Sequence, residues 1–144
     1  MELAFTLIKN AFLLFVGLIG ILFVLALLFG KRKLTRWEFE AEFRDASGRE
    51  YGEFDIEMSK IEKDESDYTF KATFNMRHER LQTGVNVKVV LDDTLVLAGT
   101  VEKTGRVRLY TPHLVNRLDE ARDGQRAAVL LDDIEFVSAV LRPD

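Results

Sequence analysis

The sequence predicts a single N-terminal transmembrane helix plus an all-β domain, which is an antiparallel β-sandwich or partly closed barrel of about eight strands with one short helix. Two patterns in the 144-residue chain carry this prediction. Residues 11–30 contain no charged side chain, whereas after residue 36 apolar residues recur at alternate positions, the period of a half-buried strand. The chain has room for one ordinary domain and an anchor.

The apolar run 11–30 matches the thickness of a bilayer, because about 20 helical residues span about 30 Å. A cleaved signal peptide is the alternative, but its apolar region is shorter and ends in small residues. This run ends in the bulky Leu28 and Phe29 and continues into Lys31. We therefore expect an uncleaved transmembrane helix at residues 11–30, after a short tail at 1–10.

The flanks of the helix predict its orientation. Positive charge lies after the helix in a juxtamembrane linker, residues 31–36, whereas the N-terminal side offers Lys9 opposed by Glu2. Basic segments stay on the cytoplasmic side of a membrane. We expect the N-terminus outside and the β domain in the cytoplasm, with the topology determined by Lys31, Arg32, Lys33 and Arg36.

Charge and composition exclude several classes of function for the soluble domain, residues 37–144. The segment 1–33 holds one of the 24 acids and four of the 20 bases, which leaves the remainder with a net charge of −7. So acidic a domain is a poor ligand for nucleic acid. The absence of cysteine excludes disulfides, thiol chemistry and Cys-ligated zinc.

Alternation is clearest in the first two expected strands. Trp37, Phe39 and other apolar residues alternate with glutamates, the turn residues 45–48 follow, and a second alternating strand comes next. Aligning the apolar residues places Trp37 opposite Ile56 and Phe39 opposite Phe54. Further strands are expected near 68–76, 85–91, 95–101, 107–109, 127–131 and 134–141.

Residues 111–124 differ from the strands. Thr111 suits a helix cap, Pro112 suits the first helical position and Gly124 suits a stop, so we expect a helix of about ten residues. On either side of this helix a short pattern occurs twice, from Gly84 to Asp93 and again from position 124 to position 133. Duplication and convergent hairpin chemistry explain this repeat equally well.

The outward residues of the first hairpin form the candidate partner-binding surface. In the expected register Glu38 faces Asp55 and Glu40 faces Glu53, although like charges directly opposite each other are unfavourable. Three interpretations remain open: a docking surface for a basic partner, a divalent-cation site, or a solvated face relieved by neighbouring bases. The acids are Glu38, Glu40, Glu42, Glu53, Asp55 and Glu57, and the bases Lys71, Arg77, Arg106 and Arg108.

Other polar residues have simpler explanations. The pairs Asp92-Asp93 and Asp132-Asp133 suit hairpin turns better than calcium loops. Two isolated histidines lack metal-ligand spacing, and no nucleophile elbow or glycine-rich phosphate loop is present. An alternating basic and aromatic strand can bind a ligand or balance the acidic hairpin. The two histidines are His78 and His113, and the strand carries Arg106, Arg108 and Tyr110.

We therefore expect no catalytic residues, no metal and no cofactor. A linker of six residues reaches about 20 Å and holds the domain at the bilayer. The expected function is a non-catalytic, membrane-anchored accessory or scaffold subunit, whose partners are the lipid bilayer and another integral membrane protein or complex. The alternative is a membrane-tethered ligand-binding or sensory β-sandwich module. Its short strands give the domain the general look of small bacterial β-sandwich modules.

Overall fold

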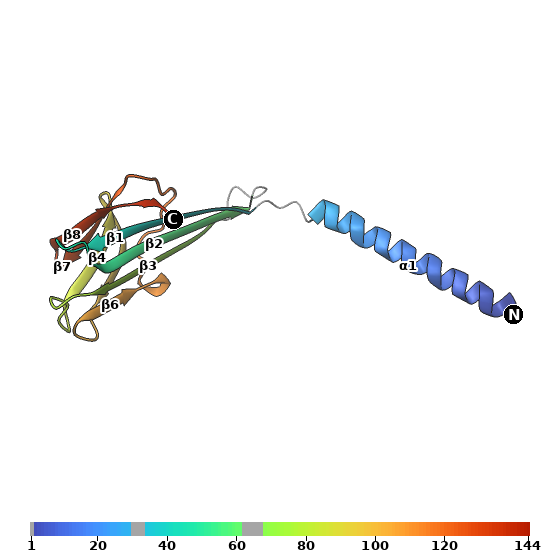
Figure 1. Ribbon diagram of the computed structural model, residues 1–144, viewed down its shortest axis with the longest axis horizontal. Coiled ribbons are helices and arrows are strands. Elements are labelled where there is room, and N and C mark those ends of the chain that lie inside the picture. Colours follow the sequence, from blue (N-terminus) through green and yellow to red (C-terminus); the bar gives the residue numbers. More distant parts are fainter. Residues whose placement is uncertain (1, 30–33, 62–67) are drawn as a thin grey trace.

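A computed structural model describes residues 2–29, 34–61 and 68–144 of the chain (Figure 1). Within these ranges one long helix precedes nine strands and one turn of 3-10 helix. The helix is α1 (Glu2–Phe29), the 3-10 turn is η1 (Thr111–His113), and the strands are β1 (Leu34–Arg44), β2 (Glu50–Ile61), β3 (Tyr68–Arg77), β4 (Asn86–Leu91), β5 (Thr94–Thr100), β6 (Arg106–Leu109), β7 (Arg126–Leu131), β8 (Ile134–Val140) and β9 (Arg142–Pro143).

Helix α1 is long and apolar enough to span a membrane. Within its segment Glu2–Leu28 an 18-residue stretch has a mean hydropathy of 3.1, and the side chains of the segment are exposed. The same properties would serve a signal sequence. The helix starts at Glu2 and so takes in most of the expected tail, because residues 3–8 are themselves mostly apolar helix formers. The linker bases Lys31, Arg32 and Lys33 lie outside the described residues.

The β domain is a sandwich of two antiparallel sheets, as the sequence predicts, and it is not a closed barrel. The five-stranded sheet has the order β6-β3-β2-β1-β9, and the four-stranded sheet has the order β5-β4-β7-β8. The described chain contains one strand more than expected. This extra strand is β9, where the chain leaves β8 in one sheet and pairs with β1 in the other.

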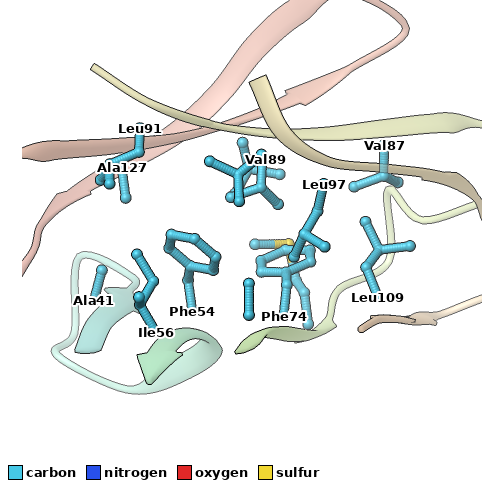
Figure 2. Close-up of a cluster of buried hydrophobic side chains, with 14 of the residues drawn as sticks. Ala41, Phe54, Ile56, Phe74, Val87, Val89, Leu91, Leu97, Leu109 and Ala127 are labelled. Atoms are coloured by element: carbon cyan, nitrogen blue, oxygen red, sulfur yellow. The ribbon is translucent and has the colours of Figure 1, made fainter. Parts of the chain in front are cut away.

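Apolar residues from the inner faces of both sheets fill the core (Figure 2). Phe54 and Phe74 rise from the five-stranded sheet toward Val89 and Leu97 of the other sheet, and all four are fully buried. Trp37 differs from these residues. It was expected to face inward in the same row, but it is 43 % exposed because it lies near the start of β1, beyond the packed part of the sandwich.

The register of the first hairpin differs from the expected one by two residues. Trp37 lies opposite Met58 and Phe39 opposite Ile56, so every side chain keeps its face but changes its partner. Two residues that the expected register did not include explain the shift, one in the turn and one in a bulge. Gly48 adopts a φ of 84° in the turn. A bulge then leaves Tyr51 without a partner between the pairs Arg44–Glu50 and Phe43–Gly52.

The expected helix at 111–124 is one turn of 3-10 helix followed by irregular chain. Beyond η1 the backbone runs along the edge of β5, where the Val115 amide donates to the Val96 carbonyl at 2.8 Å. The Asn116 side-chain amide donates to the Leu95 carbonyl at 2.9 Å. The segment thus pairs with an edge strand, and its Leu118 side chain is buried.

The two repeated segments form hairpins that lie side by side in the four-stranded sheet. Strands β4 and β7 pair antiparallel about Val89 opposite Val129, so each hairpin is related to the other by a local twofold axis. Both hairpins begin at a glycine with positive φ, 92° at Gly84 and 90° at Gly124. Both also carry a bulge at the same place, after Val89 and after Val129.

Candidate functional site

The structure brings all six predicted acids together on the outer face of the β1–β2 hairpin, here called the acidic face. Strand alternation places them there, because every second residue of each strand turns away from the core. The two-residue shift changes their pairing from the expected one. The observed pairs across the strands are Glu38 with Glu57, Glu40 with Asp55 and Glu42 with Glu53.

Arginines of the same hairpin balance the two ends of the acidic face. Arg36 lies 2.5 Å from Glu38 and 3.2 Å from Glu57. At the other end Arg44 binds Glu42 and lies 3.9 Å from Glu50. Arg36 was expected as a topology residue in the linker, and it is part of β1 because that strand already starts at Leu34.

The four bases that the sequence suggested as counterions lie on β3 and β6. In the described part of the chain no ion pair joins them to the acidic face. Two of them lie on the edge strand β6, with β3 between that strand and the hairpin. The four are Lys71, which lies opposite Glu57 on β3, and Arg77, Arg106 and Arg108.

The centre of the acidic face has no basic counterion in the described part of the chain. Carboxylate oxygens of Glu40, Glu53 and Asp55 lie within 4.8 Å of one another. Burial, a hydrogen bond with Glu53 and the charges of Glu53, Glu40 and Asp144 raise the pKa of Asp55 to about 8. Burial also raises the pKa of Glu40, with Asp144 as the next cause.

The C-terminus contributes to this centre through β9. The Asp144 amide donates to the Glu38 carbonyl at 3.1 Å, which continues the β1–β9 pairing to the end of the chain. The acid therefore stands beside the acidic face and adds negative charge to it. A sequence reading could not find this contact, because β9 is two residues long and lacks an alternating pattern.

The geometry limits what the central carboxylates can do. Three carboxylates could contact a cation, but hard cations prefer about six to eight oxygens that include backbone carbonyls of irregular loops. These three side chains stand on regular strands whose carbonyls pair within the sheet. The arrangement suits a shared proton at neutral pH, or a guanidinium or ammonium group presented by a partner.

The paired aspartates serve as turn residues. Asp92 and Asp132 both adopt positive φ, 40° and 49°. The carboxylate of Asp92 accepts from the Arg126 amide at 3.0 Å, and that of Asp132 accepts from the Asn86 amide at 3.0 Å. Each side chain thus ties its hairpin to the neighbouring strand, which explains the repeat without a bound ion.

The sequence did not predict an aromatic cluster that lies at the far end of the sandwich. The ring of His78 lies 5.3 Å from Tyr51 and 4.8 Å from Phe136, and the Arg80 guanidinium lies 5.7 Å from the Phe136 ring. His78 is half-buried, and its Nδ1 accepts from the Arg80 amide at 3.1 Å. The cluster depends on the bulge at Tyr51, which no local sequence pattern signals.

Comparison with known protein families, characterised proteins and solved structures finds no match to this chain. A function must therefore be proposed from the fold and from the side chains described above.

Proposed function

We propose that this protein is a non-catalytic, membrane-anchored accessory or scaffold subunit that contacts a larger membrane protein complex. The observation that carries the proposal is the combination of an apolar helix with an acidic face whose centre lacks counterions among the described residues. The helix supplies a place in the membrane, and the acidic face supplies a surface for a basic partner.

The short connection between the two parts supports this proposal. Only the segment 30–33 separates α1 from β1. A tether of that length reaches at most roughly 18 Å. A domain held that close to the bilayer meets membrane proteins before it meets soluble ones. The first residues of β1 and the paired ends of β2 and β3 are the parts of the sandwich nearest to this tether (Figure 1).

We propose further that the helix is an uncleaved anchor and that the β domain lies in the cytoplasm. Basic residues follow the helix, and the segment after it lacks the small residues of a cleavage site. Reporter fusions after Asp144 test the topology: a cytoplasmic reporter should be active there. Active alkaline phosphatase at the same position, or a chain that starts after residue 30 in mature protein, would contradict it.

The acidic face is the proposed docking surface, and its partner is a basic cytoplasmic segment of another integral membrane protein. Opposite charges across an interface steer association and set its register. A basic side chain inserted between Glu40, Glu53 and Asp55 would also relieve their mutual repulsion, which together with burial, the larger cause, raises the pKa of Asp55. Docking at this face therefore removes an energetic cost that the isolated domain carries.

Extraction in mild detergent tests the proposal. The protein should migrate as part of an assembly larger than its monomer, and Glu40→Lys with Glu53→Lys should release it. A matched control is Glu79→Lys with Asp93→Lys, which makes the same charge change at exposed residues away from this face. A monomeric wild-type protein, or an assembly that survives the first pair of changes, would contradict the docking proposal.

A ligand-binding or sensory module is the second candidate function. It is favoured by a surface cavity lined by arginines at the other edge of the same sheet. The two functions respond to different substitutions, because the cavity lies at β6 and the acidic face lies at β1 and β2.

A further inference from the structure

A cavity of about 720 Å³ lies against the edge strand β6. Residues of β3, β6 and the turn η1 line the cavity, together with the end of β5 and the segment that follows it. This volume falls within the range of small-molecule sites in proteins. The cavity shares no lining residue with the acidic face.

Four basic side chains line this cavity, here called the basic wall: Arg77, Lys103, Arg106 and Arg108. Arg77 and Arg106 lie directly opposite each other across β3 and β6, a pairing that is unfavourable for like charges. The turn around Gly105 then folds Lys103 back beside Arg106.

The basic wall has no acid within ion-pair distance in the described part of the chain, although the domain as a whole is strongly acidic. Glu102 also lines the cavity, and it makes no ion pair with these four residues there. Elsewhere on the sandwich exposed arginines do find carboxylates, as Arg44 and Arg126 do. The four cations on one cavity wall therefore mark a local excess of positive charge.

Two aromatic side chains face this charge from the η1 side. The Arg108 guanidinium lies 5.7 Å from the centre of the Tyr110 ring, and Tyr110 packs edge-on against His113 at 5.3 Å. The Tyr110 amide donates to His113 Nδ1 at 3.3 Å. This bond leaves Nε2 as the donor of a neutral ring. The cavity lining thus offers guanidinium, ammonium and imidazole donors together.

Gly99 on β5 allows this close packing. A Cβ at Gly99 would lie 2.5 Å from Leu109 Cδ2 and 3.2 Å from His113 Cδ2. A larger residue would require the buried Leu109 side chain to move and the His113 ring to shift. The fold therefore holds the aromatic residues at the cavity by a packing contact.

We propose that this cavity binds a small anion that carries phosphoryl groups. Guanidinium groups form paired hydrogen bonds with phosphoryl oxygens, and several of them together favour an anion with more than one negative charge. A bound phosphoryl group would relieve the repulsion between Arg77 and Arg106. This site goes beyond the proposed docking function and does not depend on it.

Calorimetric titration of the full chain in lipid nanodiscs with inorganic pyrophosphate tests the proposal. We expect saturable binding to zwitterionic discs that weakens as salt concentration rises. Arg106→Gln with Arg108→Gln should weaken binding by at least about tenfold, because each change removes a charged hydrogen-bond donor. Lys88→Gln with Arg126→Gln on the other sheet makes the same charge change and should leave binding within about twofold.

Conservative substitutions distinguish a loss of affinity from a loss of folding. Arg106→Lys with Arg108→Lys keeps the charge but removes the forked guanidinium geometry, so we expect an intermediate loss of affinity. Lys103→Gln on the turn is a second variant outside the strands. Circular dichroism of each variant establishes that it is folded before its affinity is compared.

A second set of nanodiscs, which contain phosphatidylglycerol, tests whether the phosphoryl group belongs to a lipid headgroup or to a soluble ligand. If a lipid headgroup occupies the cavity, pyrophosphate should bind these discs more weakly than zwitterionic ones. If the ligand is soluble, the affinity should be the same in both. The proposal is overturned if pyrophosphate does not bind at millimolar concentration, or if the arginine and control variants lose affinity equally.

Discussion

The two sheets of the sandwich differ in how charged side chains are arranged on their outer faces. On the four-stranded sheet bases and acids pair one to one: Lys88 lies 2.5 Å from Asp133, and Arg126 binds Glu135. On the outer face of the five-stranded sheet the charges are sorted by sign. The acidic face occupies β1 and β2 with Arg36 and Arg44 only at its ends, and the arginines of the basic wall lie on β3 and β6. The centre of each group lacks a counterion among the described residues.

This difference indicates which surface is available for function. Paired surface charges are solvated and contribute little to either stability or binding. Like charges gathered together repel one another, and a sequence selected for stability alone would separate them. The five-stranded sheet carries two such groups of like charges, the acidic face and the basic wall. For this reason we place the basic partner at the first and the anionic ligand at the second.

The largest expected effect tests whether the two sheets depend on one core. Phe74 is fully buried and packs edge-on against Phe43. Phe74→Ala should therefore lower the free energy of unfolding by about 3–5 kcal/mol, which denaturant unfolding measures. Ile134→Ala is the control, since Ile134 is 73 % exposed and its truncation should change little. Equal losses for the two variants would mean that the inner faces do not form the shared core.

The next effect tests the repulsion within the acidic face. Asp55 keeps its proton up to about pH 8 in the folded protein and loses it near 3.8 when unfolded, so the native state binds more protons between these values. This carboxyl therefore lowers stability as pH rises through that interval. Asp55→Asn should be more stable than wild type at the upper end, by about 1–2 kcal/mol because solvent screens a half-buried group.

The Asp55→Asn advantage should fade as pH falls toward 4, where both forms are neutral. Thermal or denaturant unfolding at pH 8, 6 and 4 follows this difference. A constant difference across the three values would show that Asp55 is not protonated in the native state and that the acidic face is relaxed.

A smaller effect tests whether the twin hairpins of the four-stranded sheet are equivalent. Gly84→Ala and Gly124→Ala each force a side chain into a strongly positive φ. Each should cost about 1 kcal/mol or more of unfolding free energy. No neighbouring atom lies within 4 Å of either added Cβ, so backbone strain alone sets the cost. Clearly unequal losses would contradict the local twofold relationship.

The smallest effect concerns the paired charges. Lys88→Met and Arg126→Met each remove one ion pair from the four-stranded sheet, and each should change the unfolding free energy by no more than about 0.5 kcal/mol. Chemical denaturation at low and high salt measures this. A loss well above about 1 kcal/mol for either would mean that this sheet also relies on its surface charge.

Local patterns predict much of this fold. Alternation places Phe54, Ile56 and the acids of β2 on the correct faces, and an unbroken apolar run predicts the helix. The exact pairing in the first hairpin was wrong by two residues. A turn glycine and a bulge each add one residue, and because the two additions together make a shift of two, every side chain stays on its face. Register therefore depends on backbone detail that periodicity does not contain.

Non-local contacts account for the other differences. The segment after Thr111 has the spacing of a helix, yet hydrogen bonds to the edge of β5 hold it extended. At the candidate site alternation placed the six acids on one face, but the bases that the sequence suggested as counterions form no ion pair with them in the described part of the chain. The counterions are Arg36 and Arg44 of the same hairpin, and Asp144 joins the acids because β9 crosses to the other sheet.

Site-specific photo-cross-linking in the membranes of cells that contain the protein tests the central claim most directly. A photoreactive residue replaces Thr73, which lies opposite Asp55 on β3, and in a matched chain it replaces Val90 on the four-stranded sheet. We predict an adduct with a membrane protein that has a basic cytoplasmic segment, formed from position 73 alone and lost with Glu40→Lys and Glu53→Lys. An equal adduct from position 90, or one that survives the charge reversal, would contradict docking through the acidic face.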